Sequence, residues 1–221
     1  MISLKKEVIL HLERGDYKDI LSLAPSVHKI FNTLIKLSYD KSSLLAWQAI
    51  EAVGVISREI AKTEPETVRN LTGRLLWMIR DESGGIGWSS PEMLGEIVRN
   101  NPHSFSDVAP VIVSFHDETM LRAGVLWALG RMGKINEETA GYAIPIALQY
   151  VRSPDHRVRA YAAFALGELG ALGAVTLLEH LLDDSNAVPC YENGKLADKS
   201  VGKFAEEALA KIKEGSGGSR K

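Results

Sequence analysis

The chain has 221 residues, with 26 basic against 28 acidic side chains and a net charge of −2. Hydrophobic residues make up 45% and charged residues 24%, a balance typical of soluble globular proteins, and the lack of a basic surplus argues against a general nucleic-acid binder. Cys190 is the only cysteine, so an intramolecular disulfide and a zinc cluster of several thiolates are excluded. Early charges at Lys5 and Lys6 and the shortness of the apolar runs predict a cytoplasmic chain with no secretory signal and no membrane span.

The first 41 residues are predicted to form an N-terminal helical cap. Apolar periodicity indicates short helices over 4–13, 17–23 and 26–37, and turn residues separate them. Because the first unit of a repeat array has no neighbour on one side, an atypical terminal unit is the expected cap of a solenoid.

Residues 42–183 carry an internal repeat. The clearest pair is WALGRMG at 127–133 and FALGELG at 164–170, which lie 37 residues apart. Weaker copies occur at 52–54, 93–95 and 208–210, so the period stays near 40 residues. A recurring period of this length is typical of helical repeat proteins.

Each repeat is predicted to contain two helices. In the best copy a first helix over 155–170 begins with Asp155 as N-cap and stops at Gly170, and a second helix follows over 175–182. The preceding copy repeats this plan over 118–133 and 137–151, with a kink expected at Pro145. Small Ala and Gly side chains in the signature allow neighbouring helices to approach closely.

Two acidic–arginine pairs recur near the start of these first helices. Glu118 stands four residues before Arg122, and Asp155 stands four residues before Arg159. That spacing places both members on one helix face, so each pair is predicted to form an ion pair that supports its helix modestly.

The Ala-Leu-Gly-x-x-Gly signature, together with the acidic residue and Arg before it, is similar to HEAT repeats. More narrowly, it resembles the phycobilisome-lyase-like group of short HEAT-like repeats, most closely over 118–183. This resemblance implies an all-α solenoid of about five helix pairs. It implies the function less sharply, because members of the group range from bilin-attachment factors to metal-dependent hydroxylases to plain scaffolds.

Residues 184–199 interrupt the helical pattern. Asn193-Gly194 between two short β-prone segments predicts a β-hairpin with a type I′ turn, inserted before a C-terminal helix over 200–214. The Gly- and Ser-rich tail at 215–221 resembles a linker and is expected to be disordered.

The segment 80–92 is the least regular part of the repeat array. It combines three glycines in four positions with Asp81, Glu82 and Trp88, and it ends at Pro91 and Glu92. One interpretation is a recognition loop in which Trp88 is an aromatic anchor with a charged rim. The other is an ordinary turn between repeats, in which Ser90 is the N-cap and Pro91 takes the first helical position.

A second candidate surface is the groove formed by the second helices of successive repeats. Its candidate positions are Tyr142, Gln149, Tyr150, Thr176, Glu179 and His180. The leading hypothesis is a non-catalytic scaffold that binds a protein or peptide through this groove and the 80–92 loop, with no cofactor.

An enzyme of the hydroxylase or bilin-lyase type is the alternative that the resemblance implies. Hydroxylases of this class carry His-Glu pairs that bind two irons, whereas this chain has no His-Glu dipeptide and has the reversed order at Glu179-His180. A stacking surface for nucleic-acid bases is a further alternative, because the chain has four tryptophans. Trp47, Trp77 and Trp127 lie in apolar surroundings and are expected in the core.

Overall fold

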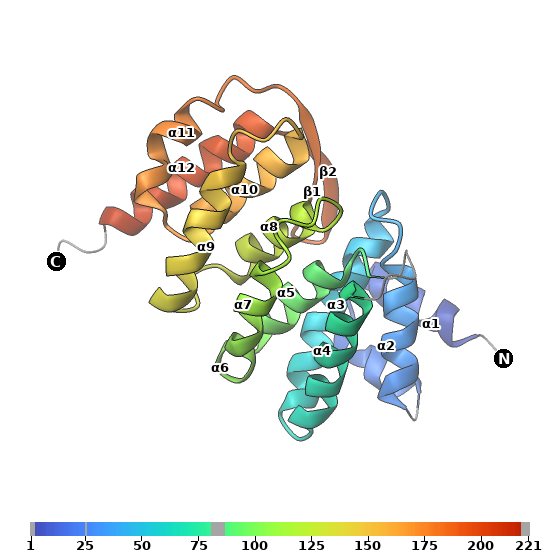
Figure 1. Ribbon diagram of the computed structural model, residues 1–221. Coiled ribbons are helices and arrows are strands. Elements are labelled where there is room, and N and C mark those ends of the chain that lie inside the picture. The colour runs from blue at the N-terminus through green and yellow to red at the C-terminus, as the bar shows by residue number, and fades with distance from the viewer. Residues whose placement is uncertain (1–2, 25, 81–86, 218–221) are drawn as a thin grey trace. The chain divides into compact units, whose positions relative to one another are not determined.

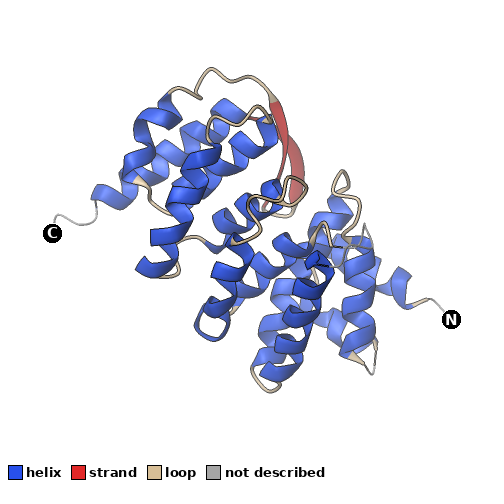
Figure 2. Ribbon diagram, in the orientation of Figure 1, coloured by secondary structure: helices blue, strands red, loops and turns tan. Residues whose placement is uncertain are grey.

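The computed structural model describes residues 3–24, 26–80 and 87–217 (Figures 1 and 2). The predicted all-α repeat fold with one small β-hairpin is confirmed. The chain forms two compact units: residues 1–105 with 191–196, and residues 106–190 with 197–221. The acidic and glycine-rich part of the candidate loop, 81–86, and the last four residues lie outside the described chain.

The first unit is made of six α-helices and one 3-10 helix. They are α1 (Leu4–Arg14), η1 (Tyr17–Leu23), α2 (Val27–Leu37), α3 (Leu44–Ala61), α4 (Pro65–Arg80), α5 (Ser90–Asn100) and α6 (Pro102–Phe105). The helices predicted in the N-terminal region begin and end within a residue of their observed bounds. In Figure 1, α2, α3 and α4 lie side by side, and α3 also packs against α5.

The start of α5 differs by one residue from the prediction. Ser89, not Ser90, is the residue before the helix, and its side chain caps no backbone N–H. The Ser89 hydroxyl instead donates a hydrogen bond of 2.7 Å to the carbonyl of Ser38. A contact with a residue 51 positions away is not visible in a local capping pattern.

The second unit continues the helical repeats. Its elements are η2 (Ser106–Val108), α7 (Ala109–Val113), α8 (Arg122–Met132), α9 (Glu137–Tyr150), α10 (His156–Glu168), η3 (Leu172–Ala174), α11 (Val175–Glu179), β1 (Ala187–Glu192), β2 (Lys195–Ser200) and α12 (Val201–Gly217). Three predicted bounds were wrong: α8 begins four residues after Glu118, α11 ends three residues before Leu182, and α12 stays helical to Gly217. Asp155 caps α10 as predicted, since its carboxylate accepts N–H bonds from Arg157 and Val158.

The glycine of the repeat signature is where one first helix meets the next. A Cβ placed on Gly167 would lie 2.6 Å from the Cα of Ala208, and one on Gly54 would lie 2.6 Å from the carbonyl oxygen of Glu96. A Cβ on Gly130 would overlap the ring of Phe164. These contacts join α10 to α12, α3 to α5 and α8 to α10. The prediction that the small residues of the signature allow neighbouring helices to approach closely is therefore confirmed.

The two signature arginines make the same contacts in their respective repeats. Arg122 donates to the carbonyls of His116 and Asp117, which lie six and five residues before it. Arg159 donates to the carbonyls six and five residues before it, and it also pairs with Asp184 at 2.6 Å. The predicted ion pairs of these arginines with Glu118 and Asp155 were therefore wrong, because each guanidinium bonds the turn that precedes its helix.

The hairpin has the predicted turn. Asn193 and Gly194 have φ angles of 50° and 74°, the left-handed pair that a type I′ turn requires. The turn and its flanking residues, 191–196, belong to the first unit.

Among the described helices, none is both long enough and apolar enough to cross a membrane.

Candidate functional site

A surface of the first unit is built around Lys41. Its ammonium group donates a 2.9 Å hydrogen bond to the carbonyl of Trp88 and lies 2.7 Å from a carboxylate oxygen of Glu92. The indole N–H of buried Trp47 donates to the carbonyl of Lys41 at 2.9 Å. Together with the bond between Ser89 and the 38–43 loop, these contacts fix the 87–89 turn to that loop.

Three large apolar side chains are exposed on these two connected segments. Trp88 is 51% exposed, Tyr39 45% and Leu44 39%. We call Tyr39, Leu44 and Trp88 the aromatic surface. Asp40 follows Tyr39 in the chain, and hydrogen bonds from the hydroxyl and backbone N–H of Ser42 hold the pKa of its carboxyl below the usual range. The two connected segments thus carry three exposed apolar side chains and one ionised carboxylate.

Glu92 does not belong to the accessible part of this site. The residue is only 1% exposed, and its second carboxylate oxygen is buried with no hydrogen-bond partner among the described residues. Because a buried carboxylate needs a counter-charge, Glu92 holds Lys41 in place, and Lys41 in turn holds the Trp88 turn. Asp81 and Glu82, the rest of the predicted rim, fall outside the described residues.

The predicted groove residues of α9 are partly occupied with internal contacts. Gln149 is exposed, whereas Tyr142 and Tyr150 are half-buried. The Tyr150 hydroxyl donates to the carbonyl of His116 and lies 2.9 Å from Nδ1 of the same histidine, and the guanidinium of Arg122 covers its ring. Burial raises the pKa of Tyr142, so this phenol stays neutral.

The remaining groove candidates lie at the end of α11. Thr176, Glu179 and His180 are exposed, and Nδ1 of His180 lies 2.6 Å from the carbonyl of Thr176. The helix α9 packs on α7 and α10, and α11 packs on α12, which in turn packs on α10.

Trp77 was expected in the core and is not there. It is 63% exposed on α4, whose buried positions are Val68, Leu71, Thr72, Leu75 and Met78. These positions follow spacings of three and four residues, and position 77 falls outside that stripe. Trp47 and Trp127 are buried, as predicted.

A buried cluster of phenols around one carboxylate was not found from the sequence. The hydroxyls of Tyr17 and Tyr191 both donate to the same carboxylate oxygen of Glu51. Trp47 stacks on Tyr191, with 5.9 Å between the ring centroids and 11° between the planes. Burial raises the pKa of Tyr17 to about 12 and also raises that of Tyr191. The two tyrosines are 174 positions apart, so no local pattern connects them.

Comparison with known proteins agrees with the geometry of the repeats. A family model of HEAT repeats matches residues 111–189. An uncharacterized protein of Archaeoglobus fulgidus is 33% identical over 143 residues, which are 62% of this chain and 73% of that protein. Residues 111–189 therefore carry HEAT repeats. The narrower likeness of this chain to the phycobilisome-lyase-like group stays a prediction.

Solved structures resemble this chain along nearly its whole length. An engineered protein superposes with a TM-score of 0.59 at 17% identity, covering 96% of this chain and 89% of its own. A designed armadillo repeat protein in complex with the peptide (KR)4 superposes with a TM-score of 0.54 at 15% identity, covering 94% of this chain and 92% of its own. At such identities the likeness shows the helical-repeat fold alone.

Proposed function

We propose that this HEAT-repeat protein is a non-catalytic scaffold that binds a protein or peptide segment on the aromatic surface. The observation that carries the proposal is the exposure of Trp88 on a turn that Lys41 and Ser89 fix to the neighbouring loop. A large aromatic side chain that is exposed on a fixed backbone turn is a common form of interface anchor.

The free energy gained when a partner covers the exposed indole favours a binding role for Trp88. Covering the exposed half of an indole removes roughly 100 Å² of apolar area from water, which corresponds to about 2–3 kcal/mol. Because the turn is already fixed, a partner loses little of that free energy to ordering the loop.

The chemistry of the aromatic surface indicates the kind of segment that fits it. An apolar side chain of the partner would pack on Trp88 and Tyr39, and a Lys or Arg next to it would lie near the ionised carboxylate of Asp40. The peptide (KR)4 that accompanies the armadillo neighbour supports basic residues in such a segment. Asp81 and Glu82 would add acidic charge to the same loop.

The exposed positions of the second unit are a proposed extension of the binding surface. Gln149 on α9, and Glu179 and His180 at the end of α11, are accessible, and the half-buried Tyr142 presents part of its ring. A partner segment that binds the second unit would contact these positions, in the manner of other helical repeat proteins.

A displayed random-peptide library selected on the wild-type protein tests this function. We expect the enriched sequences to pair an aromatic or aliphatic residue with Lys or Arg, and to lose enrichment on a Trp88→Ala variant. Trp77→Ala is the matched control, because Trp77 is a somewhat more exposed tryptophan of the same unit outside the proposed surface. Enrichment of the same sequences by the wild type and Trp88→Ala would refute the assignment.

A further inference from the structure

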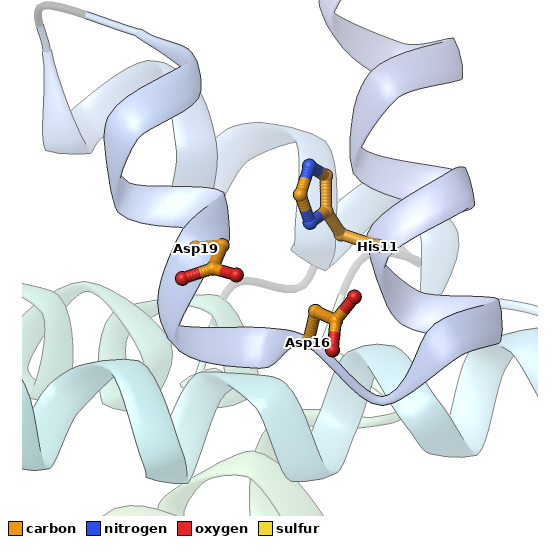
Figure 3. A group of neighbouring side chains, drawn as sticks. All are labelled: His11, Asp16 and Asp19. Carbon is orange, nitrogen blue, oxygen red and sulfur yellow. The ribbon is translucent and has the colours of Figure 1, made fainter.

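Three side chains with metal-binding chemistry converge at the end of α1. A ring nitrogen of His11 and one carboxylate oxygen each of Asp16 and Asp19 all lie within 4.8 Å of one another. Figure 3 shows the three side chains turned toward a common space between α1 and η1. Among the described residues, this is the one such group of three or more His, Cys, Asp or Glu side chains.

The backbone fixes the spacing of the three residues. Gly15 adopts a left-handed conformation with φ of 76° and reverses the chain after α1. The backbone N–H of Asp16 donates to the carbonyl of His11 at 3.0 Å, and that of Asp19 donates to the carbonyl of Asp16 at 3.2 Å. Each member of the trio is therefore joined to another by a main-chain hydrogen bond, so the site does not depend on the folding of a long loop.

The polar atoms of the trio lack protein partners. Nδ1 of His11 is buried and accepts or donates no hydrogen bond among the described residues. A buried polar atom left unpaired costs about 1–3 kcal/mol, so such atoms usually have a partner. No described side chain bonds the carboxylates of Asp16 or Asp19 either, and the nearby Lys18 pairs with Glu59 instead.

Two carboxylates that converge without a counter-ion repel each other. A cation at the centre of the trio would remove that repulsion and give Nδ1 of His11 a partner. Asp16 and Asp19 also line an open hollow of about 390 Å³, together with Tyr17, Lys18 and Val55. Because both aspartates are exposed, water can reach the remaining coordination positions of a bound ion.

We propose that His11, Asp16 and Asp19 form a binding site for a divalent transition-metal cation, with zinc as the best fit. One imidazole nitrogen and two carboxylate oxygens suit zinc, whereas calcium and magnesium prefer oxygen ligands alone. Tetrahedral zinc needs ligand atoms about 3.4 Å apart, as follows from bonds of about 2.0–2.1 Å. Asp16 and Asp19 are exposed, so their side chains have room to rotate toward that distance when an ion binds.

Untagged full-length protein, titrated with zinc chloride by calorimetry and with cobalt chloride by visible absorption, tests the site. We expect saturable binding of one zinc per chain, and cobalt bands typical of nitrogen and oxygen ligands. His11→Ala and the double variant Asp16→Asn/Asp19→Asn should weaken binding by more than the roughly 10–100-fold that loss of an outer-shell group costs. His103→Ala and Asp198→Asn, which alter exposed residues elsewhere, are the matched controls and should bind as the wild type does.

The outcomes separate a real site from incidental binding. All variants should retain the wild-type circular dichroism spectrum without metal, because no side-chain hydrogen bond or ion pair among the described residues uses these three side chains. Zinc binding that survives His11→Ala, or fails to saturate, would overturn the proposal. Equal affinity for magnesium and zinc would overturn the assignment of the imidazole as a ligand.

Discussion

The glycine at which α10 meets α12 gives the sharpest test of the packing. In Gly167→Ala the new methyl group would lie 2.6 Å from the Cα of Ala208 and 2.8 Å from its Cβ. Because a backbone atom cannot rotate away, α12 must move, and forced overpacking of this kind costs about 1–3 kcal/mol. The replacement also gains up to about 1 kcal/mol of helix propensity. We therefore expect a net destabilisation of about 1–2 kcal/mol.

Gly141→Ala is the matched control in the same unit. Gly141 also lies inside a helix, α9, but a Cβ there meets nothing within 4 Å. The same substitution should therefore stabilise the protein by about 0.5–1 kcal/mol through propensity alone.

Thermal unfolding followed by circular dichroism at 222 nm measures both changes. For a chain of this size, 1 kcal/mol moves the midpoint by about 2–4 °C. The prediction is a lower midpoint for Gly167→Ala and a higher one for Gly141→Ala. If both variants shift upward together, α10 and α12 do not pack at Gly167 as described.

Three further predictions concern other parts of the chain. Trp88→Ala should reduce the affinity for a selected peptide by about 10- to 100-fold, because the complex buries less apolar surface. Its thermal unfolding midpoint should be like that of Trp77→Ala. A large fall in the midpoint would show that the indole belongs to the core. Arg159→Met should destabilise the protein by about 1–3 kcal/mol in urea denaturation, because it leaves Oδ2 of Asp184 and two backbone carbonyls without their donor. A change in the free energy of unfolding below a few tenths of a kcal/mol would contradict this role. Stability should fall as the pH rises from about 10 toward 12, because the pKa of Tyr17 is raised from 10.0 to about 12 and the folded state favours the neutral phenol. Urea titrations across this pH range should show that the free energy of unfolding falls less steeply with pH in Tyr17→Phe than in the wild type. An unchanged dependence on pH would contradict the raised pKa of Tyr17.

Local rules recovered most of the fold from the sequence. The Asn193-Gly194 turn, the Asp155 cap and the close approach at Gly130 and Gly167 each depend on a few consecutive residues or on a repeated spacing, and the structure has all of them. The predicted start of α8 was too early. This helix begins at Arg122, after a turn that the Arg122 side chain holds, and the residues of that turn have the same composition as a helix.

The site could be predicted only in part. Trp88 is exposed, as an anchor must be. Glu92 is buried and forms a salt bridge with Lys41, and because Lys41 lies 51 positions away this contact could not be read from the local sequence. The trio at His11 was missed because its spacing matches no familiar metal-binding motif, and only the left-handed turn at Gly15 brings its side chains together.

The most direct test of the scaffold function is the dissociation constant of one selected peptide, measured by fluorescence anisotropy on three proteins. We predict equal affinity for the wild type and Trp77→Ala, and a loss of about 10-fold or more for Trp88→Ala. Equal affinity for all three proteins would contradict the claim that the aromatic surface binds the partner.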